Sequence, residues 1–250
     1  MGRRRFYAPP EAFDRHSRTV DLEADEARHL REVLRLKPGD EVYVFDGAGK
    51  EFHCTIDSSR RDVAHLRVLE EVTAARPESP LQLTLAVALL KSDKFDLVVQ
   101  KATELGVAGL VPVQTKLADI KLRDESDANK RLVRWRRIAL EAAKQSGRAL
   151  VPEVNAPVSF PDLISAQASK HYKVIFSERD GLPLESLDRE SDPHSMTALV
   201  GSEGGWADAE LDEATTAGWK VITLGGRTLR AETAAITVTA LLQNLFGDLK

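Results

Sequence analysis

Two rhythms of hydrophobic and polar residues divide this chain. In its first part, short stretches alternate apolar and polar residues, which is typical of strands with one buried face. Three such strands are predicted at residues 41–45, 50–56 and 63–69. Residues 46–49 (DGAG) separate the first two and predict a hairpin turn. One helix is predicted over residues 25–36, ending at the turn of residues 37–40. Together these elements predict a small N-terminal β-barrel, a common scaffold for recognising single-stranded RNA.

The second part of the chain alternates between strand and helix. Strands are predicted at residues 81–88, 110–113, 172–177, 197–200 and 220–224. Helices are predicted at residues 94–105, 129–146, 208–217 and 233–246, and a glycine follows each of the first three. This alternation predicts an α/β domain in which helices cover a mostly parallel sheet. A segment rich in Pro, Ser and charge lies between the two rhythms, so the expected division is residues 1–72, a linker at 73–80, and residues 81–250.

The last predicted helix carries no charged side chain between Glu232 and Asp248. A helix that is apolar nearly all round is buried on most sides. It therefore either passes through the centre of the domain or forms a subunit interface.

Composition places the chain among ordinary globular proteins. Its 250 residues are 42% hydrophobic and 30% charged, which is sufficient for one large or two modest domains. Cys54 is the only cysteine, and the six histidines are scattered singly. This pattern argues against a disulfide and a metal centre and suits a reducing cytoplasm. The basic residues 3–5 precede prolines and charge instead of an apolar stretch, so we expect neither secretion nor membrane insertion.

The formal net charge of −4 does not attract a polyanion, but basic residues are concentrated locally. One group is the arm of residues 3–5. The other is residues 130–148, which hold seven lysines and arginines and a single acidic residue, Glu141. At 100° per residue, Lys130, Arg134, Arg137, Glu141 and Gln145 share one stripe of a helix, extended by Arg148 if the helix runs that far. Such a stripe either grips phosphates or is simply a solvated outer face.

Two glycine-bearing segments lie between a predicted strand and a predicted helix. Residues 201–205 read GSEGG, and residues 224–233 read LGGRTLRAET. Glycines let the backbone approach a ligand closely, and amide groups entering a helix form a polar cradle. Open α/β sheets bind ligands outside the carboxyl ends of their strands, so both loops can line one pocket with Arg230 and Glu232 at its mouth. The alternative is a pair of plain turns in which Glu232 or Thr233 caps a helix. Neither loop matches a dinucleotide or Walker A motif, which argues against a nucleotide hydrolase.

Residues 91–106 begin with Lys91 and Lys94 and continue through Lys101. The lysines stand where a bound RNA would reach. Helix-start chemistry, with Ser92 or Asp93 as the cap, accounts for most of the segment.

Together, these segments resemble the ribosomal RNA small subunit methyltransferase E family of the SPOUT superfamily. The resemblance is carried by residues 5–9, 29–45 (HLREVLRLKPGDEVYVF), 91–107 (KSDKFDLVVQKATELGV), 141–152 (EAAKQSGRALVP), 201–205 and 224–234 (LGGRTLRAETA). These stretches are spread along nearly the whole chain, in order, and as a set they are more specific than any one of them.

The resemblance implies a PUA-like N-terminal barrel, a C-terminal SPOUT domain with a deep trefoil knot, and a homodimer. It implies that S-adenosylmethionine binds to the knot loops, chiefly through backbone groups, and that N3 of one uridine in 16S ribosomal RNA is methylated. The residues expected to hold the cofactor are Leu199, Val200, Gly201, Glu203, Gly204, Gly205, Leu224, Gly225, Leu229, Arg230, Thr233 and Ala234. Those expected to contact RNA are Arg3, Arg4, Arg5, Lys91, Lys94, Lys101, Arg134, Gln145 and Arg148. No metal is expected.

Two positions depart from the family pattern. Ser202 stands where a proline is usual, which removes a fixed φ from the first loop. Ala207 stands where a helix-capping Ser or Thr is common, which leaves Glu210 as half of a capping box. Both changes bear on cofactor affinity.

The implied chemistry needs alignment of the methyl group and removal of the proton on uridine N3. We expect Arg230 to stabilise the uracil anion, and Glu232 and Glu203 are the candidate bases or orienting groups. A different class of explanation is an RNA-binding ribosome-assembly factor that has the fold without the activity. The intact motif of residues 229–233 argues against it.

Overall fold

The computed structural model describes residues 3–166, 172–187 and 193–250. It divides the chain into two compact units. The N-terminal unit comprises Met1–Glu78 and Ala143–Val151, and the C-terminal unit comprises Ser79–Ala142 and Pro152–Lys250.

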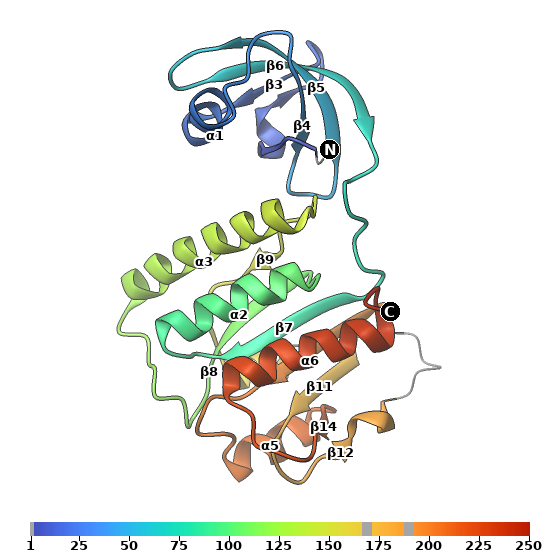
Figure 1. The fold of residues 1–250 in the computed structure, drawn as a ribbon. Coiled ribbons are helices and arrows are strands. Elements are labelled where there is room, and N and C mark those ends of the chain that lie inside the picture. Colours follow the sequence, from blue (N-terminus) through green and yellow to red (C-terminus); the bar gives the residue numbers. More distant parts are fainter. Residues whose placement is uncertain (1–2, 167–171, 188–192) are drawn as a thin grey trace. The chain divides into compact units, whose positions relative to one another are not determined.

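A curled six-stranded sheet forms the N-terminal unit (Figure 1). Its elements are β1 (Arg5–Tyr7), the 3-10 helix η1 (Pro10–Ala12), β2 (Phe13–Asp14), β3 (Thr19–Leu22), α1 (Ala24–Arg28), the π-helical turn η2 (His29–Val33), β4 (Glu41–Phe45), β5 (Glu51–Ser59) and β6 (Ala64–Val72). The strand order is β1-β4-β5-β6-β3-β2, with β1 parallel to β4 and every other pair antiparallel.

Alternation along the strands explains the core of this sheet. Val42 and Val44 of β4 are fully buried and pack with Cys54 and Ile56 of β5. The β5–β6 pair shifts register at two places, and such bulges bend and twist the strands. The three predicted strands and the hairpin are therefore confirmed. The predicted helix over 25–36 is shorter, and its second half is the π-helical turn η2.

The C-terminal unit is a parallel α/β domain. Its elements are β7 (Gln82–Ala88), α2 (Ser92–Glu104), β8 (Gly109–Gln114), α3 (Glu125–Ser146), β9 (Glu153–Val154), β10 (Val158–Ser159), α4 (Phe160–Ser165), β11 (Tyr172–Phe176), β12 (Leu182–Pro183), the 3-10 helix η3 (Leu184–Ser186), β13 (Ser195–Val200), α5 (Asp208–Thr216), β14 (Lys220–Thr223) and α6 (Ala231–Phe246). The strand order is β10-β8-β7-β13-β11-β14-β12, β9 joins β8, and all pairs are parallel. All strands and helices predicted here are confirmed to within a few residues.

Helices cover both faces of this parallel sheet. On one face, Phe160 and Ile164 of α4 pack with Leu199 of β13 and Ala214 of α5 in a buried cluster. On the other face α2 lies against α6, which contacts β7 and β13 (Figure 1). The sheet is thus buried on both sides, as the continuous apolar runs of its strands require.

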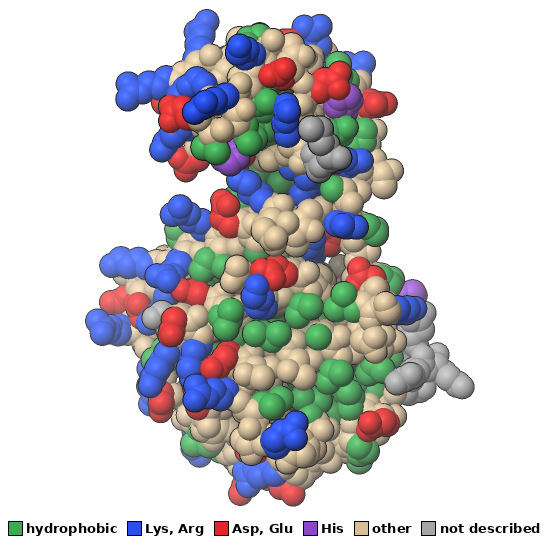
Figure 2. All heavy atoms as spheres, in the orientation of Figure 1, with side chains coloured by type: hydrophobic (Ala, Val, Ile, Leu, Met, Phe, Trp, Pro, Cys, Tyr) green, Lys and Arg blue, Asp and Glu red, His purple; other side chains and the backbone are tan. Residues whose placement is uncertain are grey.

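The apolar helix α6 buries one face and leaves the other partly open. Val238, Leu242 and Phe246 are buried, whereas Ile236 and Leu241 are only half-buried. Figure 2 shows hydrophobic side chains gathered over α2 and α6. The helix is thus buried on one side and only partly buried on the other, so both interpretations of it stay open.

Candidate active site

Three neighbouring parallel strands, β13, β11 and β14, end at the same edge of the sheet. The loop after each of them lines one cavity, together with the first turns of α6. Residues 201–205 follow β13, residues 177–178 follow β11, and residues 224–229 follow β14. The prediction that the two glycine-bearing loops share a pocket is therefore confirmed, and the pocket lies where open α/β sheets bind ligands.

The three glycines of the first loop lie close against neighbouring atoms. A Cβ at Gly201 would lie 3.1 Å from the Trp206 ring, and one at Gly204 would lie 2.7 Å from the carbonyl oxygen of Leu117. At Gly205, where φ is +68°, a Cβ would lie 2.6 Å from the carboxylate of Glu178. At Gly204 the loop's path therefore depends on the absence of a side chain. At Gly205 the Glu178 carboxylate can move aside, and it is the positive φ that favours glycine.

Two residues that depart from the family pattern lie in or beside this loop. The carbonyl oxygen of Ser202 accepts a hydrogen bond from Gly205 N at 3.0 Å, so the turn closes without proline. The Ser202 hydroxyl is buried and has no hydrogen-bond partner. After Ala207, Glu210 is half of a capping box, as predicted, because its Oε2 accepts from Ala207 N at 3.0 Å. Its Oε1 also accepts from Lys116 N at 2.8 Å, which ties α5 to the segment after β8.

An indole anchors the end of the first loop. Trp206 is buried, packs against Phe160 of α4, and its Nε1 donates to the carbonyl oxygen of Phe176 at 2.8 Å. This bond links the first loop to the end of β11. The first loop and the loop after β11 are therefore held together where they line the cavity.

The second loop has a different construction. Gly225 and Gly226 have φ of +67° and +72°, and a Cβ at either position would meet no atom within 4 Å. Gly225 N donates to Thr223 Oγ1 at 3.2 Å. Residues 225–228 are exposed. Backbone conformation, and not packing against neighbours, therefore determines the shape of this part of the cavity.

A charged cluster joins the first loop to the start of α6. Lys94 of α2 donates from Nζ to Glu203 Oε1 at 2.6 Å, and its Nζ is 3.6 Å from Glu232 Oε2. The hydrogen bond from Lys94 to Glu203 raises the pKa of Lys94. Burial would raise the pKa of Glu203, but hydrogen bonds from Lys94 and the loop backbone outweigh it and hold that pKa below its ordinary value. Glu232 Oε2 is buried without a hydrogen-bond partner.

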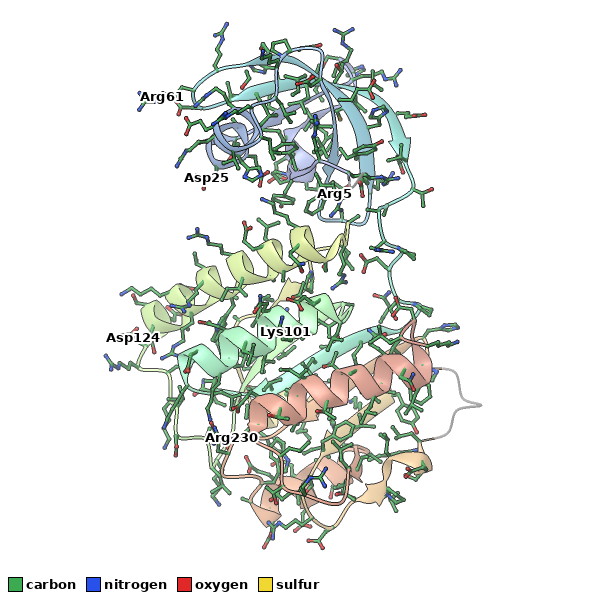
Figure 3. The ribbon with its side chains drawn as sticks, viewed as in Figure 1. Arg5, Asp25, Arg61, Lys101, Asp124 and Arg230 are labelled. Atoms are coloured by element: carbon green, nitrogen blue, oxygen red, sulfur yellow. The ribbon has the colours of Figure 1, made fainter. Side chains whose placement is uncertain are left out.

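The structure separates the predicted cofactor residues into two groups. Those that line the cavity are Val200, Gly201, Gly205, Leu224, Gly225, Leu229 and Ala234. Leu199 instead packs in the core beneath α4 and α5. Glu203, Gly204, Arg230 and Thr233 adjoin lining residues but are not among them. Arg230 is exposed at the first residue before α6 (Figure 3).

Sequence reasoning missed several lining residues. They are Phe176, Ser177, Glu178, Ser202, Trp206, Thr223, Gly226, Arg227, Thr228, Ala231 and Val238. Most of these residues belong to, or directly adjoin, the two glycine-bearing loops that the sequence predicts. Residues 176–178 come from a third loop, which the strand-end rule points to but no motif marks.

The predicted RNA-contacting residues differ in how far their charges are already engaged. Within the N-terminal unit, Arg5 is paired with Glu51 at 3.2 Å, and Arg148 is paired with Glu78 at 2.7 Å; their side chains are only 9% and 6% exposed. Arg3 also contacts Glu51, at 3.1 Å.

The remaining candidates are more open to solvent. Arg4, Lys91, Arg134 and Gln145 are exposed, although Arg134 is paired with Asp96. Lys101 is half-buried and bonds Glu104 at 2.8 Å. The exposed and buried positions of α3 match the predicted stripe, because Lys130, Arg134, Arg137, Glu141 and Gln145 are all exposed.

The parts of the chain that the structure describes contain no cluster of three or more His, Cys, Asp or Glu side chains able to hold a metal ion. The described helices include none of the length and apolarity that crossing a membrane requires. Cys54 is a free, buried thiol, and burial raises its pKa to about 12.

Comparison with known proteins agrees with this architecture. A family model described as an RNA methyltransferase domain matches residues 77–243, and one described as an RNA methyltransferase PUA domain matches residues 22–69. Ribosomal RNA small subunit methyltransferase E of Bacillus subtilis is 33% identical over 227 residues, covering 87% of each chain. Its namesake from Synechocystis is 33% identical over 231 residues, covering 91% of this chain and 73% of its own. This chain belongs to the ribosomal RNA small subunit methyltransferase E family.

Solved structures of relatives extend the likeness to the whole fold. The Neisseria gonorrhoeae ribosomal RNA small subunit methyltransferase E, bound to S-adenosylmethionine, superposes with a TM-score of 0.88 at 34% identity over 100% of both chains. A putative methyltransferase of Legionella pneumophila, also in complex with that cofactor, has the same TM-score at 30% identity over 100% of both chains. The fold class is thus that of the methyltransferase E family, a parallel α/β domain with a PUA-like N-terminal domain.

Proposed function

We propose that this protein transfers a methyl group from S-adenosylmethionine to N3 of a specific uridine in 16S ribosomal RNA. Family membership supports the coarser activity, S-adenosylmethionine-dependent methylation of small-subunit ribosomal RNA. The observation that carries the proposal is the shared cavity of the two glycine-bearing loops at the carboxyl edge of β13 and β14.

The cavity residues fit the cofactor. Gly201 and Gly205 line it without side chains, and residues of the second loop and of the first turns of α6 line the same cavity. S-adenosylmethionine supplies an activated methyl group on a sulfonium. The protein's task is to orient that group toward the attacking nitrogen and to exclude water.

Removal of the N3 proton is assigned to the charged residues at the cavity edge. Arg230 stands immediately before α6, between the lining residues Leu229 and Ala231, where its guanidinium can stabilise a uracil anion. Of the two carboxylates, Glu232 is the better candidate for a base. Glu203 is hydrogen-bonded to Lys94 with a lowered pKa, which weakens it as a proton acceptor.

The RNA contacts in this proposal are assigned to solvent-exposed residues. Arg4, Lys91, Arg134 and Gln145 are accessible for phosphate and sugar contacts, and Lys101 is partly so. Because Arg5 and Arg148 are buried in ion pairs, removing either one should disturb the N-terminal unit before it disturbs RNA binding.

The homodimer and the knot belong to the same proposal. The half-buried apolar face of α6, with Ile236 and Leu241, supports a second copy as partner. The knot rests on membership of the methyltransferase E family, and the relevant connection runs from β13 past β11 to β14. We place the reaction in the cytoplasm, where ribosomal subunits are assembled.

The decisive experiment is methylation of ribosomal RNA by the purified protein with isotopically labelled S-adenosylmethionine. Free 16S RNA and assembled small subunits serve as parallel substrates. Digestion to nucleosides and mass spectrometry should reveal labelled 3-methyluridine. Labelled 5-methyluridine, or label on another base, would overturn the N3 assignment. Cofactor binding without any transfer would favour the assembly-factor alternative.

The role of Arg230 is tested separately with Arg230→Ala. We expect kcat to fall by about 100-fold, as for the loss of one group that stabilises a transition-state anion, while RNA affinity changes little. Full turnover by this variant would remove Arg230 from the mechanism.

A further inference from the structure

Lys94 connects three segments that are distant in sequence. It stands in the first turn of α2, Glu203 lies in the loop after β13, and Glu232 lies in the first turn of α6. Its Nζ is 2.6 Å from Glu203 Oε1 and 3.6 Å from Glu232 Oε2. The side chains are 24%, 34% and 13% exposed, so the ammonium lies partly sheltered between two carboxylates.

These contacts join two parts of the cavity wall. Gly201, Ser202 and Gly205 line the cavity on either side of Glu203, and Ala231 and Ala234 line it on either side of Glu232. Lys94 hydrogen-bonds Glu203 and attracts Glu232 from 3.6 Å, so it draws the first loop and the start of α6 together. Without Lys94 the two carboxylates would repel each other across the same gap.

The same geometry makes Lys94 a poor contact for RNA. Both carboxylates that face the ammonium compete with a phosphate for it. A phosphate would also have to displace the 2.6 Å bond to Glu203. Lys91, one turn earlier, acts on Glu203 through its charge, but it is exposed and none of the described ion pairs involves it.

We propose that Lys94 is a positioning residue that clasps the first glycine loop to the start of α6, and so sets the width of the cofactor cavity, rather than an RNA-contacting lysine. This clasp, formed by Lys94, Glu203 and Glu232, is present in the fold without a ligand. Its effect on S-adenosylmethionine rests on the proposed function.

The test compares Lys94→Met, Lys94→Arg and Lys91→Met with the wild type. Lys50→Met is a matched control, because Lys50 forms an exposed pair with Glu71 at 3.1 Å on the N-terminal sheet. Titration calorimetry should show that Lys94→Met weakens S-adenosylmethionine binding about 10-fold, the size expected for loss of a charge-assisted hydrogen bond. Lys94→Arg should recover most of the affinity, and Lys50→Met should leave it unchanged. Lys91→Met should weaken it far less than Lys94→Met, because Lys91 acts on Glu203 through its charge and forms none of the described ion pairs.

RNA binding should give the opposite pattern. Lys91→Met should weaken the binding of a 16S RNA fragment and reduce the salt dependence, whereas Lys94→Met should not. Equal cofactor affinity in Lys94→Met and wild type, or a loss of RNA affinity in Lys94→Met equal to that of Lys91→Met, would overturn the proposal.

Hydrogen exchange of the ligand-free protein separates the clasp from the proposed function. Lys94→Met should speed exchange in residues 201–205 and 231–235 together, with the sheet amides unchanged. If wild type fails to bind S-adenosylmethionine, the proposed function is wrong, and this measurement still decides the clasp. Should Lys94→Met fold poorly, Glu203→Gln, which weakens the same contact and removes a charge, should give the same paired effect in the first loop and α6. Unchanged exchange in both segments contradicts the clasp.

Discussion

The two glycine-bearing loops of the cavity need their glycines for different reasons. In the first loop Gly201 and Gly204 provide space, because they lie against Trp206 and the backbone of Leu117, and only Gly205 has a positive φ. In the second loop they provide conformation, because Gly225 and Gly226 have positive φ and nothing near them.

This difference assigns the loops different parts in binding. The first loop is held by packing and by the Trp206 bond to Phe176, so it presents a preformed surface. The second loop is exposed at residues 225–228, and a bond from Gly225 N to Thr223 Oγ1 holds its turn. It can therefore adjust to a ligand, and binding costs the conformational entropy that the loop loses. We therefore expect substitutions in the first loop to damage both fold and cofactor binding, and those in the second to damage mainly binding.

The largest effect is expected for Gly204→Ala. The new Cβ would lie 2.7 Å from the Leu117 carbonyl oxygen and 3.0 Å from its Cβ, and neither is a flexible side-chain end. Overpacking of this kind costs about 1–3 kcal/mol and moves the loop. Calorimetry should show cofactor affinity reduced by about 100-fold or more, with a lower Tm.

A matched control for this change is Gly218→Ala. Gly218 has φ of +83° and no atom within 4 Å of a Cβ, and it follows α5 outside the cavity. This variant should lose some stability through backbone strain but bind the cofactor normally. If Gly204→Ala binds as tightly as Gly218→Ala, the first loop does not depend on close packing.

An intermediate effect is expected for Gly226→Ala. The backbone at φ +72° disfavours a Cβ by about 1–2 kcal/mol, and no clash is added. The loop should relax to another conformation, so cofactor affinity should fall several-fold while the Tm hardly changes. Gly226→Asn should bind better than Gly226→Ala because asparagine tolerates this region. Equal losses for alanine and asparagine would mean that space, and not conformation, matters here too.

The sequence predicted the elements that carry these loops because strand alternation, helix periodicity and terminal glycines are local signals. The shared cavity also followed, since parallel strands put their carboxyl ends at one edge. The short strands β1, β2 and β3 were missed, because two to four residues hold too little of a repeating pattern.

Contacts between distant segments were beyond sequence reasoning. Lys94 and Glu203 are 109 positions apart, and nothing in either segment indicates the other. The expectation that Lys94 contacts RNA rests on its charge, its place in the segment and the resemblance, none of which takes these carboxylates into account. Sequence reasoning missed Glu178, which lines the cavity and faces Gly205, because its loop carries no glycine pattern. The strand order β13-β11-β14 is what brings that loop to the cavity.

The smallest effect is expected for Glu203→Gln, and it depends on pH. In the folded protein the pKa of Glu203 lies below its ordinary value, although burial alone would raise it, because Lys94 and the loop backbone hydrogen-bond to the carboxylate. A carboxylate with a lowered folded pKa adds stability above its unfolded pKa, which is about 4.3, and that stability disappears as the pH falls through the folded pKa. Wild type should therefore be slightly more stable than Glu203→Gln at pH 7.

Urea unfolding from pH 7 to about pH 3.5 checks this prediction. The difference between wild type and Glu203→Gln should hold steady down to about pH 5 and shrink below it, as Glu203 becomes protonated and its bond to Lys94 weakens. Glu71→Gln, in the exposed pair with Lys50, controls for general charge effects. A difference that stays constant to pH 3.5 would mean that the Glu203 charge does not hold the first loop. The rigidity of that loop would then rest on its packing against Trp206 and Leu117 alone, which would widen the contrast with the second loop.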